Sequence, residues 1–251
     1  MNIYFEIIKQ IISSSSDERE FKKINFDEEK IKNMNHNFKD VIVQKPWGYE
    51  YLFFSSKKVS IWILKILKNH KTSMHCHTNK KTSLILLDGE ANFYTLDNKI
   101  NLKCGNAVTI EKKVFHRTSS ECGKDTLVME IETPTNKNDI VRYQDDYKRS
   151  NSGYESNESF KQIKEMDNFL NYNYIKNRAG ILGQCELKIV NSNSKEMKKL
   201  KKNNLICPIK ANNDESENQS IIGELYDIEK NNWSKDILEF LVIQGKENNS
   251  K

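Results

Sequence analysis

The chain has 251 residues, of which 37% are hydrophobic and 30% charged, a composition that is ordinary for a globular protein with one good core. The net charge of +5 comes from lysines interspersed with aspartate and glutamate, so no nucleic-acid surface is expected. The five cysteines lack Cys-x-x-Cys spacing, which argues against a disulfide framework and for a reducing, cytoplasmic compartment.

Residues 1–40 are expected to form an N-terminal extension. It begins with a short apolar helix, breaks at Ser13–Ser16 and ends in a charged helical stretch from Asp17 to Lys32. The apolar run at residues 3–12 is too short, and too interrupted by charge, for a signal segment or a membrane span. We therefore expect the segment to pack on the domain that follows, and we expect no membrane partner.

From Val41 the pattern changes to short β-rich runs bounded by turn residues. The runs lie at residues 59–67, 83–87, 91–96, 107–110 and 127–132. This rhythm predicts an antiparallel barrel or jelly roll over residues 41–150.

The remaining residues, 151–251, predict a smaller α+β segment. A linker at Ser150–Gly153 is followed by a helical pattern at residues 159–171. Strand-like pieces come after it, at residues 185–190, 221–228 and 238–243.

The sequence Met74-His75-Cys76-His77 is the most informative stretch of the chain. Because side chains alternate along a strand, His75 and His77 point the same way and Cys76 points the other. A third histidine, His116, follows at the distance expected of a small barrel. Three neutral imidazoles suit a divalent metal and leave open positions for substrate oxygens or water. The pattern thus predicts a site for zinc, manganese or iron.

The residues around these histidines resemble the two motifs of the cupin superfamily. The glycine, two histidines, glutamate and final glycine of the first motif fall on Asn69, His75, His77, Thr82 and Gly89. The second motif keeps only its glycine and its histidine, Gly105 and His116. The resemblance implies an all-β cupin barrel with the histidines inside. Threonine in place of the motif glutamate leaves metal binding an open question.

A faint echo of the first motif occurs near the end of the chain. Residues 239–245 resemble the Glu-to-Gly end of the motif, as residues 82–89 do. A degenerate second cupin half within residues 151–251 is therefore an alternative to ordinary strands and turns, which we favour.

A narrower resemblance comes from two flanking segments. Residues 45–50, Lys-Pro-Trp-Gly-Tyr-Glu, and residues 138–149 are similar to the opening and closing signatures of the cupin domain in type II mannose-6-phosphate isomerases. That domain is often fused to a mannose-1-phosphate guanylyltransferase. The resemblance implies a sugar-phosphate or nucleotide-sugar partner in surface polysaccharide synthesis. It covers residues 41 to about 150, and the glutamine, glutamate and His-Trp of the family's first motif are absent.

An aldose-to-ketose isomerisation needs a base that carries a proton between adjacent carbons. Glu130 and Glu132 share one face of a late strand and are the candidates, with surface exposure as the alternative. The candidate substrate-binding residues are Lys80, Lys81, Arg142 and Arg149. The lysines follow the histidines in a loop, and the arginines match the family's closing signature. Ion pairs with Asp139, Asp145 or Asp146 are an equal alternative for the arginines.

The favoured function is that of a cytoplasmic protein in a sugar-phosphate or nucleotide-sugar pathway that serves surface polysaccharide synthesis. The resemblance alone implies a metal-dependent sugar-phosphate isomerase similar to mannose-6-phosphate isomerase. One competing class is a non-catalytic cupin that binds a sugar or nucleotide sugar as a regulatory module, which the missing glutamate favours. Another is an oxygenase with iron held by three histidines. Metal analysis would separate these classes, and a homodimer is left open.

Overall fold

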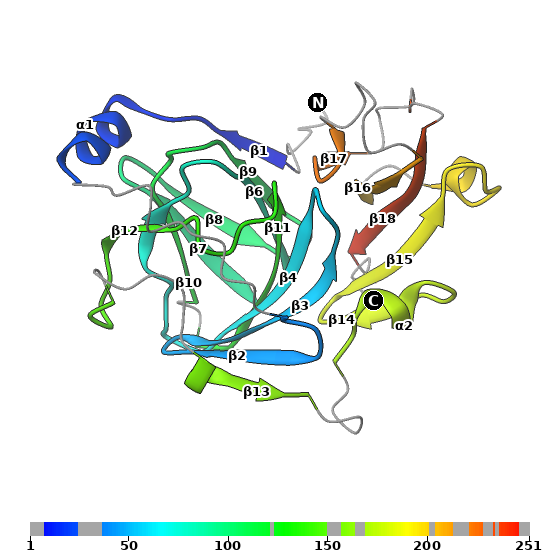
Figure 1. Cartoon of the computed structure of the whole chain (residues 1–251), viewed down its shortest axis with the longest axis horizontal. Coiled ribbons are helices and arrows are strands. Elements are labelled where there is room, and N and C mark those ends of the chain that lie inside the picture. The colour runs from blue at the N-terminus through cyan, green and yellow to red at the C-terminus, as the bar shows by residue number, and fades with distance from the viewer. Residues whose placement is uncertain are drawn as a thin grey trace, which may run out of the picture.

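The computed structural model describes residues 8–24, 37–120, 123–149, 157–163, 169–200, 204–212, 221–227, 233 and 236–245. The expected linker at residues 150–153 lies wholly outside them, as does much of the expected charged helix. Among these residues no helix is long and apolar enough to cross a membrane. Most of the described chain forms strands in three sheets (Figure 1).

The largest sheet has the strand order β1-β9-β6-β11-β4-β3-β2-β13. These strands are β1 (Ile8–Ile11), β9 (Ala107–Ile110), β6 (Lys81–Asp88), β11 (Thr126–Thr133), β4 (Ser60–Ile66), β3 (Gly48–Ser55), β2 (Val41–Lys45) and β13 (Phe160–Gln162). The second sheet, in the order β12-β5-β10-β7-β8, faces it across the barrel interior. Its strands are β12 (Val141–Gln144), β5 (Met74–Cys76), β10 (His116–Ser119), β7 (Glu90–Thr95) and β8 (Lys99–Lys103). The predicted all-β cupin barrel is thus confirmed.

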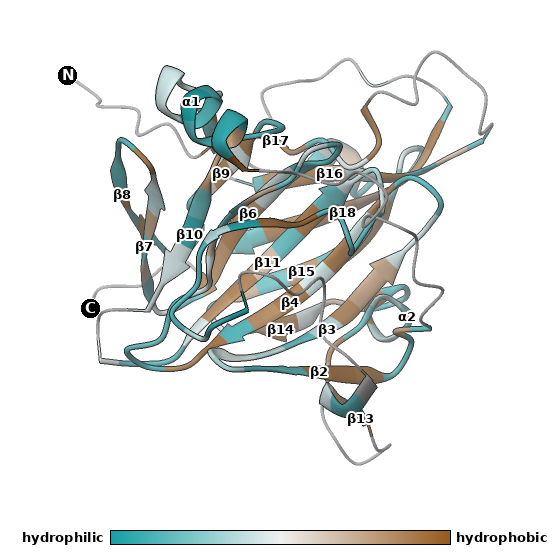
Figure 2. Cartoon of the chain, turned by 60° about the vertical axis from the view of Figure 1, so that its left-hand side comes forward, coloured by the Kyte–Doolittle hydropathy of each residue, from teal (hydrophilic) through white to brown (hydrophobic). Residues whose placement is uncertain are grey.

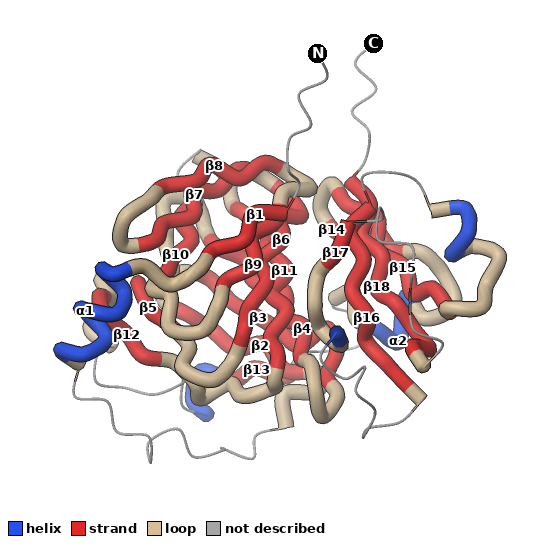
Figure 3. Tube along the Cα trace, turned by 90° about the horizontal axis from the view of Figure 1, so that it is seen from above, coloured by secondary structure: helices blue, strands red, loops and turns tan. Residues whose placement is uncertain are grey.

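A third sheet lies beside the barrel and comes from the C-terminal part of the chain (Figure 3). Its strands are β14 (Gly180–Leu182), β15 (Cys185–Asn191), β18 (Ile237–Gly245), β16 (Asn204–Ala211) and β17 (Tyr226–Asp227). The short helix α2 (Tyr172–Ile175) precedes it, and the short helix η3 (Met197–Lys199) follows β15. Figure 2 shows hydrophobic residues along the strands and hydrophilic ones on the N-terminal helix α1.

Strand β6 contributes to two hydrophobic clusters, one inside the barrel and one between the barrel and the third sheet. Its alternate residues Leu84 and Leu86 belong to the cluster inside the barrel. Ile85 and Leu87 belong instead to a cluster that contains Leu187 and other residues of the third sheet. A strand covered on both faces reads as a continuous apolar run, which is why residues 83–87 show no polar alternation.

The N-terminal segment differs in part from the expectation. Residues Ile8–Ile11 form a strand that pairs in parallel with β9, rather than a helix. The edge of the barrel sheet offers them backbone partners that a short isolated helix would lack. The expected helix does follow, as α1 (Ser15–Lys23), with a capping box between Ser14 and Asp17.

The prediction of a helix at residues 159–171 is wrong for the first of these residues. Residues Asn157–Ser159 form the short helix η2, and Phe160–Gln162 form strand β13, which pairs with β2. Residues 164–168 lie outside the described chain. Phe160 packs edge-on against Phe38, so a tertiary contact at an open sheet edge outweighs the local helical pattern. The division at residues 40 and 150 stays a prediction, and β1 and β13 contribute to the barrel sheet from beyond those bounds.

Candidate metal centre

The three predicted histidines converge inside the barrel. His75 on β5 and His116 on β10 are direct partners across the second sheet, and His77 lies one residue beyond β5. Each side chain is buried, and the candidate ligand atoms of all three lie within 4.8 Å of one another. Cys76 points the other way, into an apolar cluster with Phe115. The period-two reading of this strand is therefore confirmed.

Backbone carbonyls fix the tautomer of each ring. The Nδ1 atoms of His75 and His116 lie 2.9 Å from the carbonyl oxygens of Ser73 and Val114, and His77 Nδ1 lies 2.5 Å from that of Asp139. Since a carbonyl can only accept, each Nδ1 carries the proton and each neutral Nε2 keeps its lone pair. Neutral histidines held in this way are typical metal ligands.

The Nε2 atom of His77 is buried and has no hydrogen-bond partner among the described residues. Burying a polar atom without a partner costs free energy, so the position calls for a ligand. A divalent metal fits this donor set, because three imidazole nitrogens suit zinc, manganese or iron.

Burial keeps these histidines neutral. It lowers the pKa of His116 to about 4. It also lowers the pKa of His75 and His77 well below the ordinary value, helped by His116 for His75 and by the Lys80 ammonium for His77. All three rings are thus unprotonated at neutral pH, as metal ligands must be.

Asp139, in the loop between β11 and β12, holds the turn that carries His77. Its fully buried carboxylate accepts hydrogen bonds from the backbone N–H groups of Thr78, Asn79 and Lys80 at 2.8–3.0 Å. It also accepts one from the Thr78 hydroxyl at 2.7 Å. The Asp139 carbonyl also accepts a hydrogen bond from the His77 ring. Together these bonds hold the His77 imidazole in its orientation. The sequence offered Asp139 only as a partner for arginine, and this positioning role was missed.

Glu130 and Glu132 are both buried on β11 and line the cavity that holds His75 and His77. Glu132 accepts hydrogen bonds from Lys80 at 2.7 Å, from Lys137 at 3.3 Å and from the Ser60 hydroxyl at 2.9 Å. Glu130 accepts one from Lys137 at 3.2 Å. Exposure at the surface is therefore excluded for both carboxylates.

The environments of the two carboxylates push their pKa values apart. Burial raises the pKa of Glu130 above its ordinary value. Burial acts the same way on Glu132, but Lys137 and Lys80 outweigh it and lower the pKa to about 2. A carboxylate of raised pKa beside one that stays ionised is an arrangement typical of acid–base sites.

Lys137 is a second residue that the sequence did not reveal. Its ammonium contacts Glu50, Glu130 and Glu132 at 3.2–3.3 Å and lies 4.1 Å from the centre of the Trp62 ring. Burial opposes its charge, but Glu132 and the other carboxylates raise its pKa above the ordinary value. It lies in a loop that matches no motif, so only the fold brings it to the site.

The four candidate substrate-binding residues occupy different places. Lys80 is buried at the cavity in its ion pair with Glu132, and Arg142, on β12, is the cross-strand neighbour of His75. Arg149 also lines the cavity, but its guanidinium holds Asp145 through bonds of 2.8 and 3.0 Å. Lys81 does not line the cavity and forms ion pairs with Glu111 and Glu224.

Thr82 takes the position of the missing motif glutamate. It is buried opposite Glu132 in the register between β6 and β11, so both side chains share the interior face. Its hydroxyl has no hydrogen-bond partner among the described residues. A carboxylate on the neighbouring strand, that of Glu132, thus shares the face of this position.

The two facing sheets and the converging histidines define a cupin barrel with a three-histidine centre. More particularly, the family model described as D-lyxose isomerase matches residues 59–168, which contain all three histidines and both interior glutamates. This match covers less than half of the chain. The matched family differs from the mannose-6-phosphate isomerases that the flanking segments resemble. No curated protein matches the chain.

Several solved structures are similar over part of the chain. KdgF from Halomonas sp. shares 16% identity at a TM-score of 0.36, with 41% of this chain and 94% of that chain covered. Oxalate decarboxylase from Lactobacillus farciminis shares 13% identity at a TM-score of 0.37, with 41% of this chain and 33% of that chain covered. A cupin-2 domain protein from Shewanella frigidimarina shares 19% identity at a TM-score of 0.31, with 34% of this chain and 78% of that chain covered. The fold described above rests on the sheets themselves.

Proposed function

We propose that the protein is a metal-dependent sugar isomerase that interconverts an aldose and its ketose. The observation that carries the proposal is the cavity in which tautomer-fixed His75 and His77, with His116 beside them, meet two carboxylates of divergent pKa. The match to the D-lyxose isomerase model over the same residues supports a sugar substrate.

The chemistry divides among the residues of this cavity. A bound divalent metal would polarise the sugar's carbonyl and hydroxyl oxygens. Glu130, whose pKa is raised by burial, takes the proton from C2 of the aldose and returns it to C1. The hydroxyl proton on O2 passes to O1, so the atoms balance.

Neighbouring charges hold the base and the sugar in place. Glu132 stays ionised and keeps the ammonium groups of Lys80 and Lys137 fixed. Arg142, buried beside His75, is positioned to donate hydrogen bonds to sugar oxygens. The buried setting excludes bulk water, which strengthens each of these interactions.

Mannose 6-phosphate as substrate and a place in polysaccharide synthesis are finer proposals. They are supported only by the flanking segments at residues 45–50 and 138–149. A sugar-binding cupin without catalysis stays a second candidate, because Thr82 supplies no carboxylate where the motif has one.

The test is metal-dependent ketose formation. The protein is stripped with a chelator, reloaded separately with Mn²⁺, Zn²⁺ or Fe²⁺, and assayed with a panel of free and phosphorylated aldoses. We expect one metal to restore turnover, His116→Ala to abolish it, and His70→Ala, outside the cavity, to leave it intact. Tight metal binding with no ketose from any aldose would favour the binding-only candidate.

A further inference from the structure

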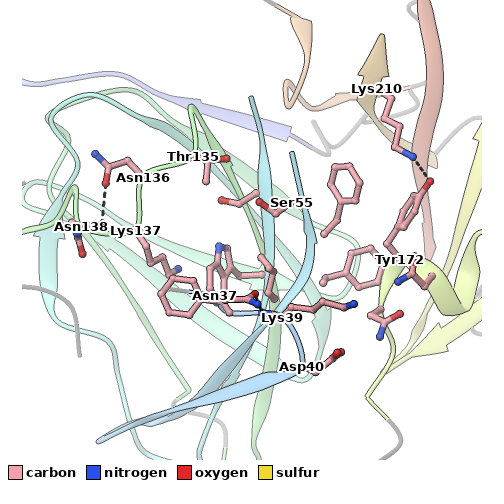
Figure 4. A pocket seen from close by; sticks show the side chains of 18 residues that line it. Asn37, Lys39, Asp40, Ser55, Thr135, Asn136, Lys137, Asn138, Tyr172 and Lys210 are labelled. Carbon is pink, nitrogen blue, oxygen red and sulfur yellow. Dashed lines mark hydrogen bonds between the residues drawn. The ribbon is translucent and has the colours of Figure 1, made fainter. Parts of the chain in front are cut away.

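A second and much larger cavity lies beside the metal centre, between the barrel and the C-terminal unit (Figure 4). Its volume is ≈ 690 Å³, within the usual range for small-molecule sites. Phe54 and Trp62 of the barrel line it together with Tyr172 of α2 and Lys210 of β16. We call it the outer cavity, and the one at the histidines the inner cavity.

The inner cavity is too small for a whole sugar. Its volume is ≈ 60 Å³, and a water molecule needs roughly 10–15 Å³ on this measure. It therefore admits about four to six water-sized groups, fewer than the carbon and oxygen atoms of a pentose. A sugar whose C1–C2 end reaches the histidines must extend beyond this space.

Only one layer of side chains separates the two cavities. Lys137 lines both, with its ammonium at the inner carboxylates and 4.1 Å from the centre of the Trp62 ring. Ser60 lines the outer cavity and donates a hydrogen bond of 2.9 Å to Glu132, which lines the inner one. The outer cavity lies next to the inner one across this layer, so a substrate at the histidines extends into it when the Lys137 side chain moves aside.

The lining of the outer cavity suits an uncharged saccharide. Trp62 is 2% exposed, and its Nε1 has no hydrogen-bond partner among the described residues. A substrate that displaces the side chains covering this donor would offer it an acceptor, such as a sugar oxygen. Aromatic faces pack on the C–H faces of sugar rings, and side-chain amides such as those of Asn136 and Asn173 bond hydroxyls.

The charges on the same walls are largely balanced. Lys137 is paired with carboxylates and Lys210 is 2.9 Å from Glu239, while Lys39 and Asp40 bring one charge of each sign to the wall. Among the described residues of this lining, a phosphate would meet no cluster of available cations. The lining thus disfavours an anionic group and favours hydroxyls.

We propose that the outer cavity is a saccharide subsite, so that the preferred substrate has two or more neutral sugar units with its reducing end at the histidines. This inference rests on the proposed isomerase function and names its substrate class. The reaction at the reducing end leaves the glycosidic bond intact and needs no co-reactant.

The subsite is tested without metal or catalysis. Tryptophan fluorescence of the chelator-treated protein is titrated with cellobiose, lactose and maltose, and with glucose and glucose 6-phosphate. We expect at least one disaccharide to bind at least tenfold more tightly than either monosaccharide. Trp62→Phe should lose this preference and most of the signal, and Trp233→Phe, in the C-terminal cluster, should keep both.

Two matched variants test whether the outer cavity is the binding site, because one fills the cavity and the other leaves it unchanged. Asn173→Phe adds a ring to its wall, whereas Asn177→Phe adds the same ring to an exposed position of the same segment that does not line it. Disaccharide binding, followed by the rise in melting temperature, should be lost only in Asn173→Phe. Equal affinity for mono- and disaccharides, or an unaffected Asn173→Phe, would overturn the proposal. Disaccharide binding without turnover of any aldose would instead contradict the isomerase function alone.

An independent observation concerns two cysteines that the sequence separates widely. Cys104, after β8, and Cys185, on β15, have sulfur atoms 3.6 Å apart although they are 81 positions apart in the chain. Cys185 is buried, whereas Cys104 is only partly buried and lines an open cavity between the barrel and the third sheet. A small oxidant can therefore reach one sulfur, with the second already beside it.

We propose that Cys104 and Cys185 form a peroxide-driven disulfide that joins the barrel to the C-terminal sheet. The Cys104 thiolate attacks the peroxide O–O bond, giving a sulfenic acid and water when the oxidant is hydrogen peroxide. The Cys185 sulfur then attacks the sulfenic sulfur, the S–S bond forms and a second water leaves. The two thiols lose two electrons and two protons, which the peroxide takes up.

The order of attack follows from the neighbouring groups. A hydrogen bond from Cys185 lowers the pKa of Cys104, and the same contact together with burial raises the pKa of Cys185. The thiolate is the nucleophile, so Cys104 reacts first.

Hydrogen peroxide treatment, thiol alkylation and peptide mass spectrometry test this pairing on the full chain. We expect a Cys104–Cys185 crosslinked peptide, absent from Cys104→Ser and Cys185→Ser but present in Cys207→Ser. The melting temperature should rise by about 5 °C or more, reversibly with dithiothreitol. Complete alkylation of both cysteines after peroxide treatment would overturn the proposal.

Discussion

Replacing Asp139 by asparagine should loosen the metal centre without touching a ligand. The asparagine can still accept through Oδ1 from the Thr78 N–H and hydroxyl. Its Nδ2 would face the N–H groups of Asn79 and Lys80, which now bond Oδ2 at 2.8 and 3.0 Å. Two charge-assisted bonds are lost and two donors face each other, so the free energy of unfolding should fall by about 3–5 kcal/mol.

The same change should weaken metal binding. His77 donates its Nδ1–H to the Asp139 carbonyl, so a displaced loop misorients that ring. Losing such an outer partner typically costs about 10–100-fold in metal affinity. A competition titration with a chromogenic chelator measures the affinity, and urea denaturation measures the stability. Asp146→Asn is the control, since Asp146 is half-exposed in its pair with Lys71 and should cost at most about 1 kcal/mol. Wild-type affinity and stability in Asp139→Asn would refute this role of Asp139.

Three further changes probe the buried charges. The pKa of His116 falls from about 6.5 unfolded to about 4 folded, so the folded metal-free protein binds fewer protons between these values. Its unfolding free energy should therefore fall by about 3 kcal/mol as pH drops from 6.5 to 4, and urea titrations of His116→Gln should show a weaker pH dependence. Lys80→Met should cost about 3–5 kcal/mol because it removes the ammonium 2.7 Å from buried Glu132 and leaves that carboxylate with Lys137, which Glu50 and Glu130 share. Lys81→Met, in partly exposed pairs, should cost about 1 kcal/mol or less; equal thermal shifts would contradict this. Thr82→Glu should add a carboxylate to the interior face and raise metal affinity at least tenfold, about 1.4 kcal/mol; unchanged affinity would mean that the added carboxylate does not reach the histidines.

The alternation of side chains on a strand was enough to predict the core of the site. It placed His75 and His77 on one side and Cys76 on the other, and it gave Glu130 and Glu132 a common face. These features are local, so the sequence alone expresses them.

The rest depends on contacts between distant residues. Residues Ile8–Ile11 read as helical, but the open edge of β9 pairs with them as a strand. Lys137 reaches Glu50 and Glu132 only because a loop folds over the barrel. No spacing rule brings Cys104 to Cys185, or Asp139 to the turn that follows His77.

The central claim is that the histidine cavity exchanges a proton at C2 of an aldose, with Glu130 as the base. The measurement is deuterium incorporation from D₂O into C2 of D-lyxose, followed by proton NMR, with metal-loaded wild type and Glu130→Gln. We predict exchange by the wild type and none by Glu130→Gln, although the variant still binds metal. Equal exchange by both proteins would contradict the role of Glu130. No exchange by the metal-loaded wild type, with D-lyxose or any other aldose, would contradict the isomerase itself.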